Sequence, residues 1–551
     1  MLRVALAALL LVACLLAVIL PQVKRRLRQF HAFKTIPGPP CPSSSFWAGV
    51  TKQLHDPSTI EYREHVLTQC GRVVKLPAFL GDIQLSISDP LALSALYGKY
   101  RDAFDLPGWH SETFSVVFGP GLTAARGHQH IKQRKHLSPV FSVRYLKDMI
   151  SIFNQVAQEL SDTLADKASR DSEGTEVEIS EYLSRFSLEA VGRTALGYSF
   201  GPINAHGTHY SRSLKEFGPT LVKLQLWRPL LPWVKCLFPS SVLRYLASVI
   251  PWHPLRHMKA ISDDVYKTSR QVLRRKGELL KQGDEVMRQE IGEGKDLVSI
   301  LLRQNVTGLE GERMTEDDIL GQMSLLLLAA TDTTSTTVAR IVQLLAENQD
   351  VQETLRRELQ DATVHTGRTL LDMDYDEFVR LRYLEAVVCE TIRMYPAFYT
   401  GNRVSDEDAV LPLSEPIIGT DGKPIVELFI PAGTIVWINM VGSNRDTAIW
   451  GHDANEWKPE RWLAPQPSSV AEAHIPSVFA NLSSFAAGAR SCIGYNYALT
   501  EMRMAVAHLV LQLKFTPSDK EIVWKLGGVV SPSVRGSKST KPEFPVVISR
   551  V

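Results

Sequence analysis

The sequence predicts a mainly α-helical chain with small β-sheets, preceded by an N-terminal membrane anchor. Residues 4–20 contain no charged side chain, and this run has the length of a short membrane span. Long runs with the helical spacing of apolar residues follow Thr315 and Gly494. Short apolar runs of strand-like character predict small sheets, at 72–76, 83–88, 522–524 and 545–548.

Composition and charge exclude several classes of protein. The chain has 551 residues, of which 44% are hydrophobic and 22% charged, as in ordinary globular proteins. A net charge of +2 gives no field that would attract nucleic acid, so we expect no nucleic-acid partner. The cysteines are scattered without a Cys-x-x-Cys pair, which indicates neither a zinc site nor a disulfide framework. Length alone suggests three or four domains.

The N-terminal apolar run is interpreted as a transmembrane signal anchor over residues 1–22. Arg3 is the only charged residue before it, whereas a basic cluster follows it: Lys24, Arg25, Arg26 and Arg28. The positive-inside rule then places the body of the protein in the cytosol. A cleaved signal peptide is the alternative, but the run is long for one and no clear small-x-small cleavage site precedes Pro21. Residues 23–40 form a basic, proline-rich linker that we expect to act as a spacer.

Two segments in the middle of the chain each allow two interpretations. Residues 128–141 form a helix rich in Lys, Arg and His, which is a solvated face or, in part, a docking face for an acidic redox partner. Residues 222–250 are apolar and interrupted by three prolines. They pack in the core or form an irregular apolar flap at a membrane interface. Residues 259–281 have the pattern of a charged amphipathic helix.

A long apolar helix is predicted to begin after Thr315. The sequence Thr315-Glu-Asp-Asp318 has the pattern of a capping box, with Thr315 as the N-cap. Further along, Asp332 is flanked by Thr331, Thr333 and Thr334, which is costly in a buried helix unless these polar groups are satisfied or used. Either each threonine hydroxyl bonds the carbonyl one turn back, or the helix opens locally at this point.

Residues 383–395 read as a second helix, which Pro396 stops. Glu390 and Arg393 lie on one face of this helix at i, i+3, among apolar neighbours, so a buried ion pair is plausible. A buried pair needs further hydrogen bonds to offset the cost of desolvation. Arg461, in the sequence Pro459-Glu-Arg-Trp462, is the candidate for a second guanidinium.

The most informative stretch is Phe485-Ala-Ala-Gly488-Ala-Arg490-Ser-Cys492-Ile-Gly494, which leads into an amphipathic helix pattern over residues 498–513. Cys492 lies just ahead of a helix N-terminus, where unpaired N–H groups and the helix dipole favour thiolate over thiol. A thiolate can serve as the axial ligand of haem iron. Gly488 and Gly494 let the backbone pass close to a flat macrocycle, and Arg490 supplies a cation for a haem carboxylate. A lone cysteine is more simply explained as a small apolar residue at a helix start. That explanation does not account for Phe485, Gly488, Arg490 and Gly494 at their spacing from Cys492.

This loop resembles the haem-binding loop of the cytochrome P-450 family, the haem-thiolate monooxygenases, and the similarity extends over nearly the whole chain. The resemblance implies the cytochrome P-450 fold, with one large helical catalytic domain over residues 41–551 and haem b bound through Cys492. The family pattern Ala-Gly-x-Asp/Glu-Thr-Thr/Ser matches residues 329–334, with Ala330 in place of the usual glycine. Asp332 and Thr333 are then the proton-delivery acid and alcohol, at a local helix opening where oxygen and water bind.

The resemblance implies further site residues. His130 and Arg134, one turn apart, and Arg403 correspond to residues that bond haem propionates, although position 130 is often Trp in the family. Residues 397–400 are candidates for substrate contact. A structural charge cluster, which ties the core to the loop that leads to the haem, corresponds to Glu390, Arg393 and Arg461.

The function that the resemblance implies is oxidation of an apolar small molecule at the endoplasmic reticulum membrane, by a single-pass protein with its catalytic domain in the cytosol. One atom of O2 enters the substrate by hydroxylation, epoxidation or further oxidation. NADPH electrons come from a separate diflavin reductase, because no flavin or nicotinamide domain is visible. The chain most resembles fungal enzymes of secondary metabolism, which favours a terpenoid or another secondary metabolite as substrate and leaves polyketide-like, fatty-acyl and aromatic molecules open. The alternatives are a reductase-independent isomerase or dehydratase, against which Asp332 and Thr333 argue, and a non-enzymatic haem sensor or electron carrier.

Overall fold

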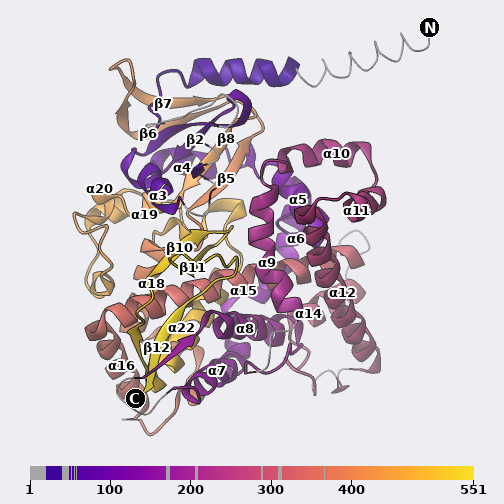
Figure 1. The fold of residues 1–551 in the computed structure, drawn as a ribbon, viewed down its shortest axis with the longest axis vertical. Coiled ribbons are helices and arrows are strands. Elements are labelled where there is room, and N and C mark those ends of the chain that lie inside the picture. Colours follow the sequence, from indigo (N-terminus) through magenta and orange to yellow (C-terminus); the bar gives the residue numbers. More distant parts are fainter. Residues whose placement is uncertain are drawn as a thin grey trace. The chain divides into compact units, whose positions relative to one another are not determined.

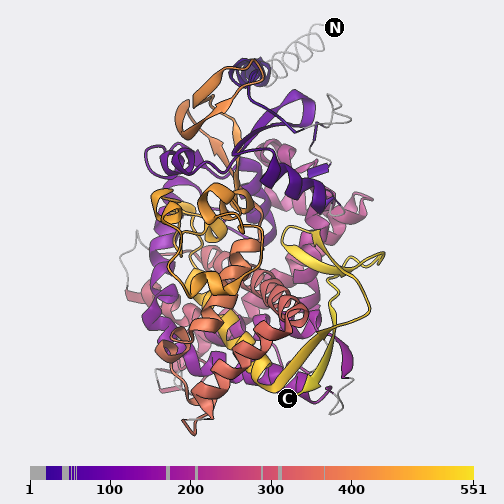
Figure 2. The same cartoon turned by 90° about the vertical axis from the view of Figure 1, so that its left-hand side faces the viewer.

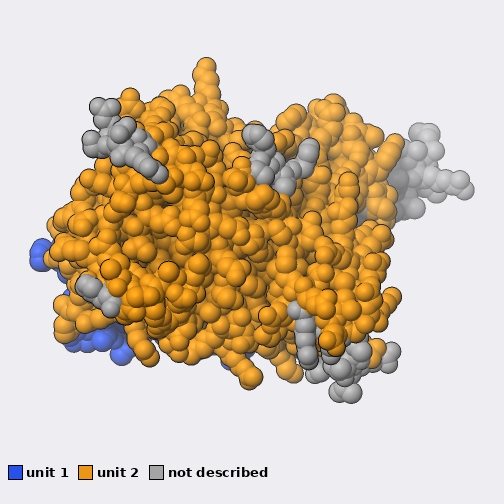
Figure 3. Space-filling model, turned by 90° about the horizontal axis from the view of Figure 1, so that it is seen from below, with its two compact units in different colours: residues 1–107, 400–454, 467–491 blue, residues 108–399, 455–466, 492–551 orange. Residues whose placement is uncertain are grey.

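A computed structural model describes residues 20–39, 49–50, 53–54, 56, 59–168, 174–204, 209–283, 285–286, 289–307, 313–364 and 366–551 (Figure 1). The chain forms two compact units, which Figure 3 colours separately. Unit 1 comprises Met1–Pro107, Thr400–Ala454 and Pro467–Ser491, and unit 2 comprises Gly108–Tyr399, Asn455–Gln466 and Cys492–Val551. The predicted class, mainly helical with small sheets, is confirmed.

Unit 1 is built on a five-stranded sheet in the order β1-β2-β8-β5-β3. The strands are β1 (Val73–Pro77), β2 (Ile83–Ile87), β8 (Ile435–Asn439), β5 (Thr400–Ser405) and β3 (Phe104–Asp105). Strands β2 and β8 are parallel, and the other neighbours are antiparallel. A separate antiparallel pair joins β6 (Ala409–Ile418) to β7 (Pro424–Ile430). The strands predicted near residues 72–76 and 83–88 are therefore confirmed.

The helices of unit 1 are short. Besides the helical residues 20–32, they are α3 (Ile60–Gln69), α4 (Pro90–Tyr97), α19 (Met440–Asn444), α20 (Thr447–Trp450) and α21 (Ser468–Glu472), with single turns η1 (Phe79–Gly81), η8 (Ser483–Phe485) and η9 (Gly488–Arg490). Apolar side chains from α4 and from both sheets of unit 1 share one buried cluster. Phe33 and Ile36 belong to the same cluster.

The described part of the predicted linker is held against unit 1. Residues 20–32 are helical. Arg25 bonds Asp82 at 3.1 Å, and the carbonyl of Pro37 accepts a hydrogen bond from the N–H of Lys75 at 2.8 Å. Residues 4–19 of the predicted anchor lie outside the described residues. Within the described ranges, no helix combines the length and the apolar character needed to cross a membrane.

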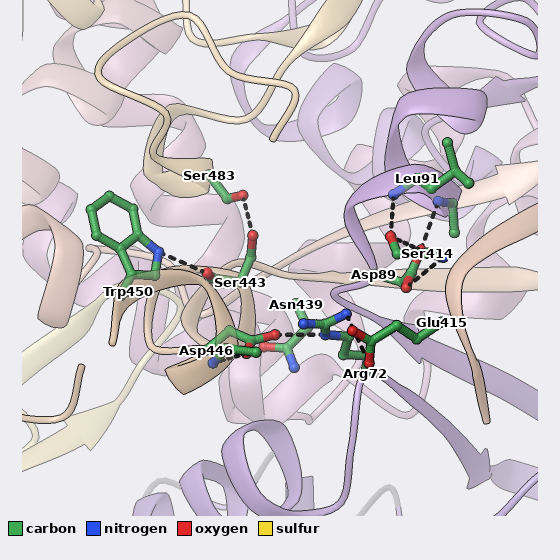
Figure 4. Close-up of polar contacts among 12 residues, drawn as sticks. Arg72, Asp89, Leu91, Ser414, Glu415, Asn439, Ser443, Asp446, Trp450 and Ser483 are labelled. Carbon is green, nitrogen blue, oxygen red and sulfur yellow. Dashed lines mark hydrogen bonds and ion pairs between the residues drawn. The ribbon is translucent and has the colours of Figure 1, made fainter. Parts of the chain in front are cut away.

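Polar contacts inside unit 1 fix the segment that leads to the cysteine loop (Figure 4). Ser443 on α19 bonds the hydroxyl of Ser483 at 3.1 Å and accepts from the indole N–H of Trp450 at 3.2 Å. The neighbouring Asn444 accepts from the N–H of Ser483 at 2.9 Å. Arg72 bonds Asp446 at 2.7 Å, just after α19. The start of η8 is thus set by the α19 segment rather than by its own sequence.

Unit 2 is organised around the long helix α15 (Glu316–Glu347), which packs against α8 (Ser180–Val191), α12 (His253–Gln282), α18 (Arg382–Met394) and α22 (Tyr495–Gln512). Its predicted capping box is confirmed: Thr315 Oγ1 accepts from the N–H of Asp318 at 3.1 Å, and Asp318 accepts from the N–H of Thr315 at 3.0 Å. The predicted helices near 259–281 and 383–395 are also confirmed. The amphipathic pattern predicted for 498–513 is wrong, because every residue from 499 to 510 is buried.

The other elements of unit 2 surround these helices. The helices are α5 (Gly108–Phe118), α6 (Gly127–Leu137), α7 (Val143–Ala165), α9 (His209–Leu224), α10 (Leu231–Leu237), α11 (Ser240–Val249), α14 (Leu297–Thr307), α16 (Gln349–Thr363) and α17 (Tyr375–Val379). The short turns are η2 (Ser138–Phe141), η3 (Gly192–Leu196), η4 (Arg228–Leu230), η6 (Leu370–Asp372) and η7 (Pro459–Trp462). The strands are β4 (Thr175–Glu178) and, in yellow in Figure 2, β9 (Leu513–Pro517), β10 (Ile522–Leu526), β11 (Val530–Val534) and β12 (Pro545–Arg550). Both predicted C-terminal strands are present.

The segment around residues 222–250 exposes its apolar side chains. It contains the end of α9, then η4, α10 and α11. Core packing, one of the two interpretations of this segment, is therefore wrong for most of it. The exposed large apolar residues are Leu226, Trp227, Leu230, Trp233, Val234, Leu237, Phe238, Val242, Tyr245, Val249 and Ile250.

Candidate active site

Cys492 begins the last segment of unit 2, just ahead of α22. Its side chain is accessible. Nevertheless the surrounding protein is dense enough that burial raises the pKa of the thiol, and this outweighs the N–H of Gly494 and the charge of Arg134, which lower it. The backbone N–H of Gly494 thus favours the thiolate, as the sequence predicts, but burial has the larger effect on the pKa in the protein without a bound metal. The sulfur is open to a ligand, and a metal ion would displace its proton.

One face of the central helix α15 is also uncovered. Ala329 is exposed in the middle of a helix whose other sides are buried, and Thr333, one turn on, is partly accessible. The Thr333 hydroxyl donates to the carbonyl of Ala329 at 2.6 Å. The hydroxyls of Thr331 and Thr334 are buried without a hydrogen-bond partner. The interpretation that each threonine hydroxyl bonds the carbonyl one turn back is therefore right for Thr333 and wrong for these two.

The local helix opening expected near Asp332 is absent. Helix α15 continues without interruption from Glu316 to Glu347. Ala330, which replaces the glycine of the family pattern, disfavours such a distortion because it has a lower tendency than glycine to leave helical conformation. Thr333 is therefore presented on a regular helix.

Asp332 is an acid tuned to neutral pH. Burial raises its pKa to about 7, and the positive charge of Lys215 on α9 opposes this shift. Burial in turn lowers the pKa of Lys215. A carboxyl group with a pKa near the working pH can both take up and release a proton. Sequence reasoning missed Lys215, because no local pattern connects a lysine on α9 with an acid on α15.

The predicted pair on α6 lies in the same unit as Cys492. Arg134 is close enough to Cys492 for each charge to shift the pKa of the other group, although burial lowers the pKa of Arg134. His130, one turn earlier on α6, is buried. The helix thus brings the guanidinium of Arg134 to the neighbourhood of Cys492 that the sequence predicted.

The other predicted cofactor residues belong to unit 1. Arg403 on β5 is buried, and its Nη1 donates to the carbonyl of Asn402 at 2.8 Å. Among the described residues no carboxylate lies within 4 Å of it, and burial lowers its pKa. Arg490 instead bonds Asp105 at 2.5 Å and 2.8 Å, so part of its guanidinium is already engaged.

Gly488 and Phe485 shape the loop that leads to the cysteine. Gly488 has φ +65°, and a Cβ at this position would lie 3.1 Å from Cδ1 of Tyr97. Both observations require glycine here. Phe485 packs edge-on against Phe479, with ring centroids 6.2 Å apart. In unit 2, a Cβ on Gly494 would lie 3.4 Å from the ring of Phe141, which is ordinary van der Waals contact, so the structure alone does not require glycine at this position.

The predicted charge cluster is present in unit 2. Arg393 and Glu390 are fully buried and form two hydrogen bonds of 2.8 Å, and Arg461 lies 3.4 Å from the same carboxylate. Glu390 also accepts from the N–H of Lys458 at 3.0 Å and the indole of Trp462 at 2.9 Å. The cluster ties α18 to η7.

Glu501 is a second buried acid that sequence reasoning did not single out. It lies on α22, and burial raises its pKa to about 8. The hydroxyls of Ser187 and Thr334 oppose the shift, but neither reaches full hydrogen-bond geometry with the carboxyl group. The sequence signal that could have found Glu501 is its position as an acid inside the apolar run after Cys492.

These residues fit a haem group. Within unit 2, Cys492 offers an exposed side chain, Ala329 and Thr333 form an uncovered helix face, and Arg134 lies close enough to Cys492 for their charges to interact. A haem needs an axial donor, space for a flat ring and cations for its carboxylates. No group of three or more His, Cys, Asp or Glu side chains in the described part of the chain is placed to bind a metal ion.

Comparison with known proteins agrees with this assignment. The family model described as Cytochrome P-450 matches residues 84–537. Cytochrome P-450 monooxygenase 91 of Postia placenta is 39% identical, over 97% of both chains, and ganoderic acid synthetase of Ganoderma lucidum is 35% identical, over 92% of both. Cytochrome P-450 monooxygenase 81 of Postia placenta is 37% identical, over 95% of this chain and 94% of the relative. The chain therefore belongs to the cytochrome P-450 family, whose haem-thiolate members are oxidoreductases that incorporate molecular oxygen.

Proposed function

We propose that this monooxygenase oxidises an apolar small molecule of fungal secondary metabolism, such as a terpenoid, with NADPH electrons supplied by a separate diflavin reductase. The observation that carries the proposal is the exposed side chain of Cys492 ahead of α22. Helix α22 packs against α15, and α15 leaves the face with Ala329 and Thr333 uncovered. The relative named ganoderic acid synthetase supports a role in secondary metabolism.

The haem, once bound, activates O2 and oxidises the substrate. Cys492 supplies its sulfur ligand, while Gly488 and Gly494 leave room for the ring. Arg134 and Arg403 hold its carboxylates, assisted by His130 and Arg490, and Phe485 supports the loop. The chain's contribution is to bind the cofactor, orient the substrate and exclude competing water.

Protons are the second contribution of the chain. Insertion of one oxygen atom into a substrate releases the other as water, which consumes two electrons and two protons. Asp332 holds a proton that it can release at neutral pH because its pKa is about 7, and Lys215 stabilises the carboxylate left behind. Thr333 passes the proton on once its hydroxyl turns away from the Ala329 carbonyl.

We place the protein on the endoplasmic reticulum membrane, with a single span and the catalytic domain in the cytosol. The uncharged run at residues 4–20 and the basic cluster after it support an anchor. The exposed apolar side chains of residues 226–250 support a second contact with the membrane surface.

Reconstitution tests the proposed function. The full chain is loaded with haem, combined with a fungal NADPH-dependent diflavin reductase and supplied with a panel of terpenoids. We expect oxygenated product that carries label from 18O2 and requires NADPH, reductase and O2 together. Conversion without NADPH would instead indicate a haem-thiolate isomerase or dehydratase. A haem-loaded chain whose iron spectrum responds to none of the panel would favour a sensor or electron carrier.

A further inference from the structure

The exposed apolar segment after α9 conceals one inward-pointing cation. Trp227 and Leu230 are exposed, whereas Arg228 between them is only 8% exposed. Arg228 begins η4, which packs against α5 and α10 in unit 2. A buried guanidinium is costly unless it is hydrogen-bonded or paired with a charge, so the groups around Arg228 decide what it binds.

The partners of Arg228 in the structure are all neutral. Its Nε donates to Thr113 Oγ1 at 3.1 Å, and its Nη1 donates to Gln225 Oε1 at 2.7 Å. The guanidinium carbon lies 4.6 Å from the ring centroid of Trp109. Its Nη2 is buried without a hydrogen-bond partner. A guanidinium donates five N–H groups, so this one is under-satisfied on one edge.

Among the described residues, no negative charge offsets the burial of Arg228. Burial lowers its pKa to about 9, and no acid opposes this shift. No described carboxylate lies within ion-pair distance. The one acid of α5, Glu112, is instead held by Lys235 of α10. A buried cation without a counter-charge is costly, which points to a missing anionic partner.

Helix α5, which Arg228 contacts through Thr113 and Trp109, carries further aromatic side chains. On α5, Phe114 stacks on His110 with ring centroids 4.8 Å apart. Phe118 and Phe114 both meet Phe217 of α9, at 4.8 Å and 6.0 Å. Arg228 therefore bonds a helix, α5, whose aromatic side chains pack against α9.

We propose that Arg228 binds the carboxylate of an acidic, otherwise apolar substrate. This inference rests on the proposed function and narrows its substrate class. Gln225 Oε1 occupies one edge of the guanidinium as a neutral acceptor, and its flexible side chain gives way to one carboxylate oxygen. The second oxygen then satisfies Nη2, in the paired geometry that guanidinium and carboxylate favour.

Matched acids and esters test the assignment. The haem-loaded full chain is titrated calorimetrically with dehydroabietic acid and its methyl ester, and with lauric acid and methyl laurate. We expect at least one acid to bind about tenfold or more tightly than its ester. Arg228→Gln is expected to remove this preference, because it weakens binding of the acid and leaves the affinity for the ester unchanged. Arg228→Lys keeps the positive charge but loses the paired N–H groups of the guanidinium, so we expect it to retain part of the preference for the acid.

Arg244→Gln is the matched control, because Arg244 is an exposed arginine of α11 that is already paired with Asp263. This variant is expected to keep the full preference for the acid. Equal affinity of acid and ester in both pairs, including no binding of either, would overturn the inference, as would equal weakening of both ligands by Arg228→Gln. If Arg228→Gln does not load haem, the wild-type comparison and Arg228→Lys decide.

The titration and the turnover experiment test separate claims, so each can contradict one proposal without contradicting the other. A chain that oxidises a neutral terpenoid but binds no acid better than its ester would lose this inference and keep the proposed function. A chain that prefers the acid but never forms oxygenated product with NADPH and reductase would keep the carboxylate site of Arg228 and lose the proposed function.

Discussion

Two buried acids of unit 2 have raised pKa values for the same reason but differ in their surroundings. Burial raises the pKa of Asp332 to about 7 and that of Glu501 to about 8. Lys215 acts on Asp332, whereas only the hydroxyls of Ser187 and Thr334 act on Glu501. A cation stabilises the ionised form between proton transfers, so Asp332 suits proton delivery and Glu501 suits a permanently protonated structural position.

Asp332→Asn is expected to reduce product formation by about a hundredfold, the usual scale of general acid catalysis, while haem content and ligand affinity stay unchanged. The pH dependence of turnover around pH 7 should flatten, because the group that titrates there is gone. Turnover is measured across pH 6–8. Asp317→Asn, an exposed acid of the same helix, is the control. A variant with full turnover and an unaltered pH profile would refute this assignment.

Glu501→Gln is expected to change how stability depends on pH. The unfolded chain ionises this carboxyl group above about pH 4.3, whereas the folded chain keeps the proton up to about pH 8. Unfolding between these values releases a proton, so the free energy of unfolding falls as pH rises, by at most about 1.4 kcal/mol per unit. Urea unfolding at pH 5 and pH 8 should show a smaller decline for the variant. Identical declines would contradict the raised pKa.

At the scale of elements, the Glu390 cluster joins α18 to η7. Glu390→Ala leaves the guanidinium of Arg393 buried without its partner, which is expected to cost about 3–5 kcal/mol of unfolding free energy. Lys147→Ala breaks an exposed pair with Asp376 and should cost about 1 kcal/mol or less. Urea denaturation compares the two variants. Equal losses would mean that burial does not set the strength of the cluster.

The elements that the sequence predicts well are those with local signals. The capping box at Thr315 locates the start of α15, Pro396 locates the end of α18, and alternating apolar residues locate β1 and β2. The spacing of Glu390 and Arg393 predicted their pair because i, i+3 contacts are local.

Features that depend on tertiary contacts were not predictable. Helix α22 has an amphipathic pattern, but neighbouring helices bury all of its sides between residues 499 and 510. The sequence favoured a thiolate at Cys492 from the helix terminus alone, whereas burial by the surrounding chain has the larger effect on its pKa. Lys215 and Arg228 act through neighbours on other helices, which one sequence does not reveal.

At the scale of the whole molecule, the cysteine loop is where the chain passes from one unit to the other. Unit 1 ends this stretch at Ser491, and unit 2 resumes with Cys492. Each unit supplies a different part of the predicted set: Phe485, Gly488 and Arg490 come from unit 1, and Cys492 and Gly494 from unit 2.

The central claim is that Cys492 ligates a haem iron through its sulfur, and the absorption spectrum of the reduced, carbon-monoxide-bound protein tests it most directly. The wild-type chain should show the red-shifted haem band that a thiolate ligand produces. Cys492→Ser should lose this band, whereas Cys236→Ser, at an exposed cysteine, should keep it. A Cys492→Ser protein that retains the band, or a folded wild-type chain that binds no haem, would contradict the account.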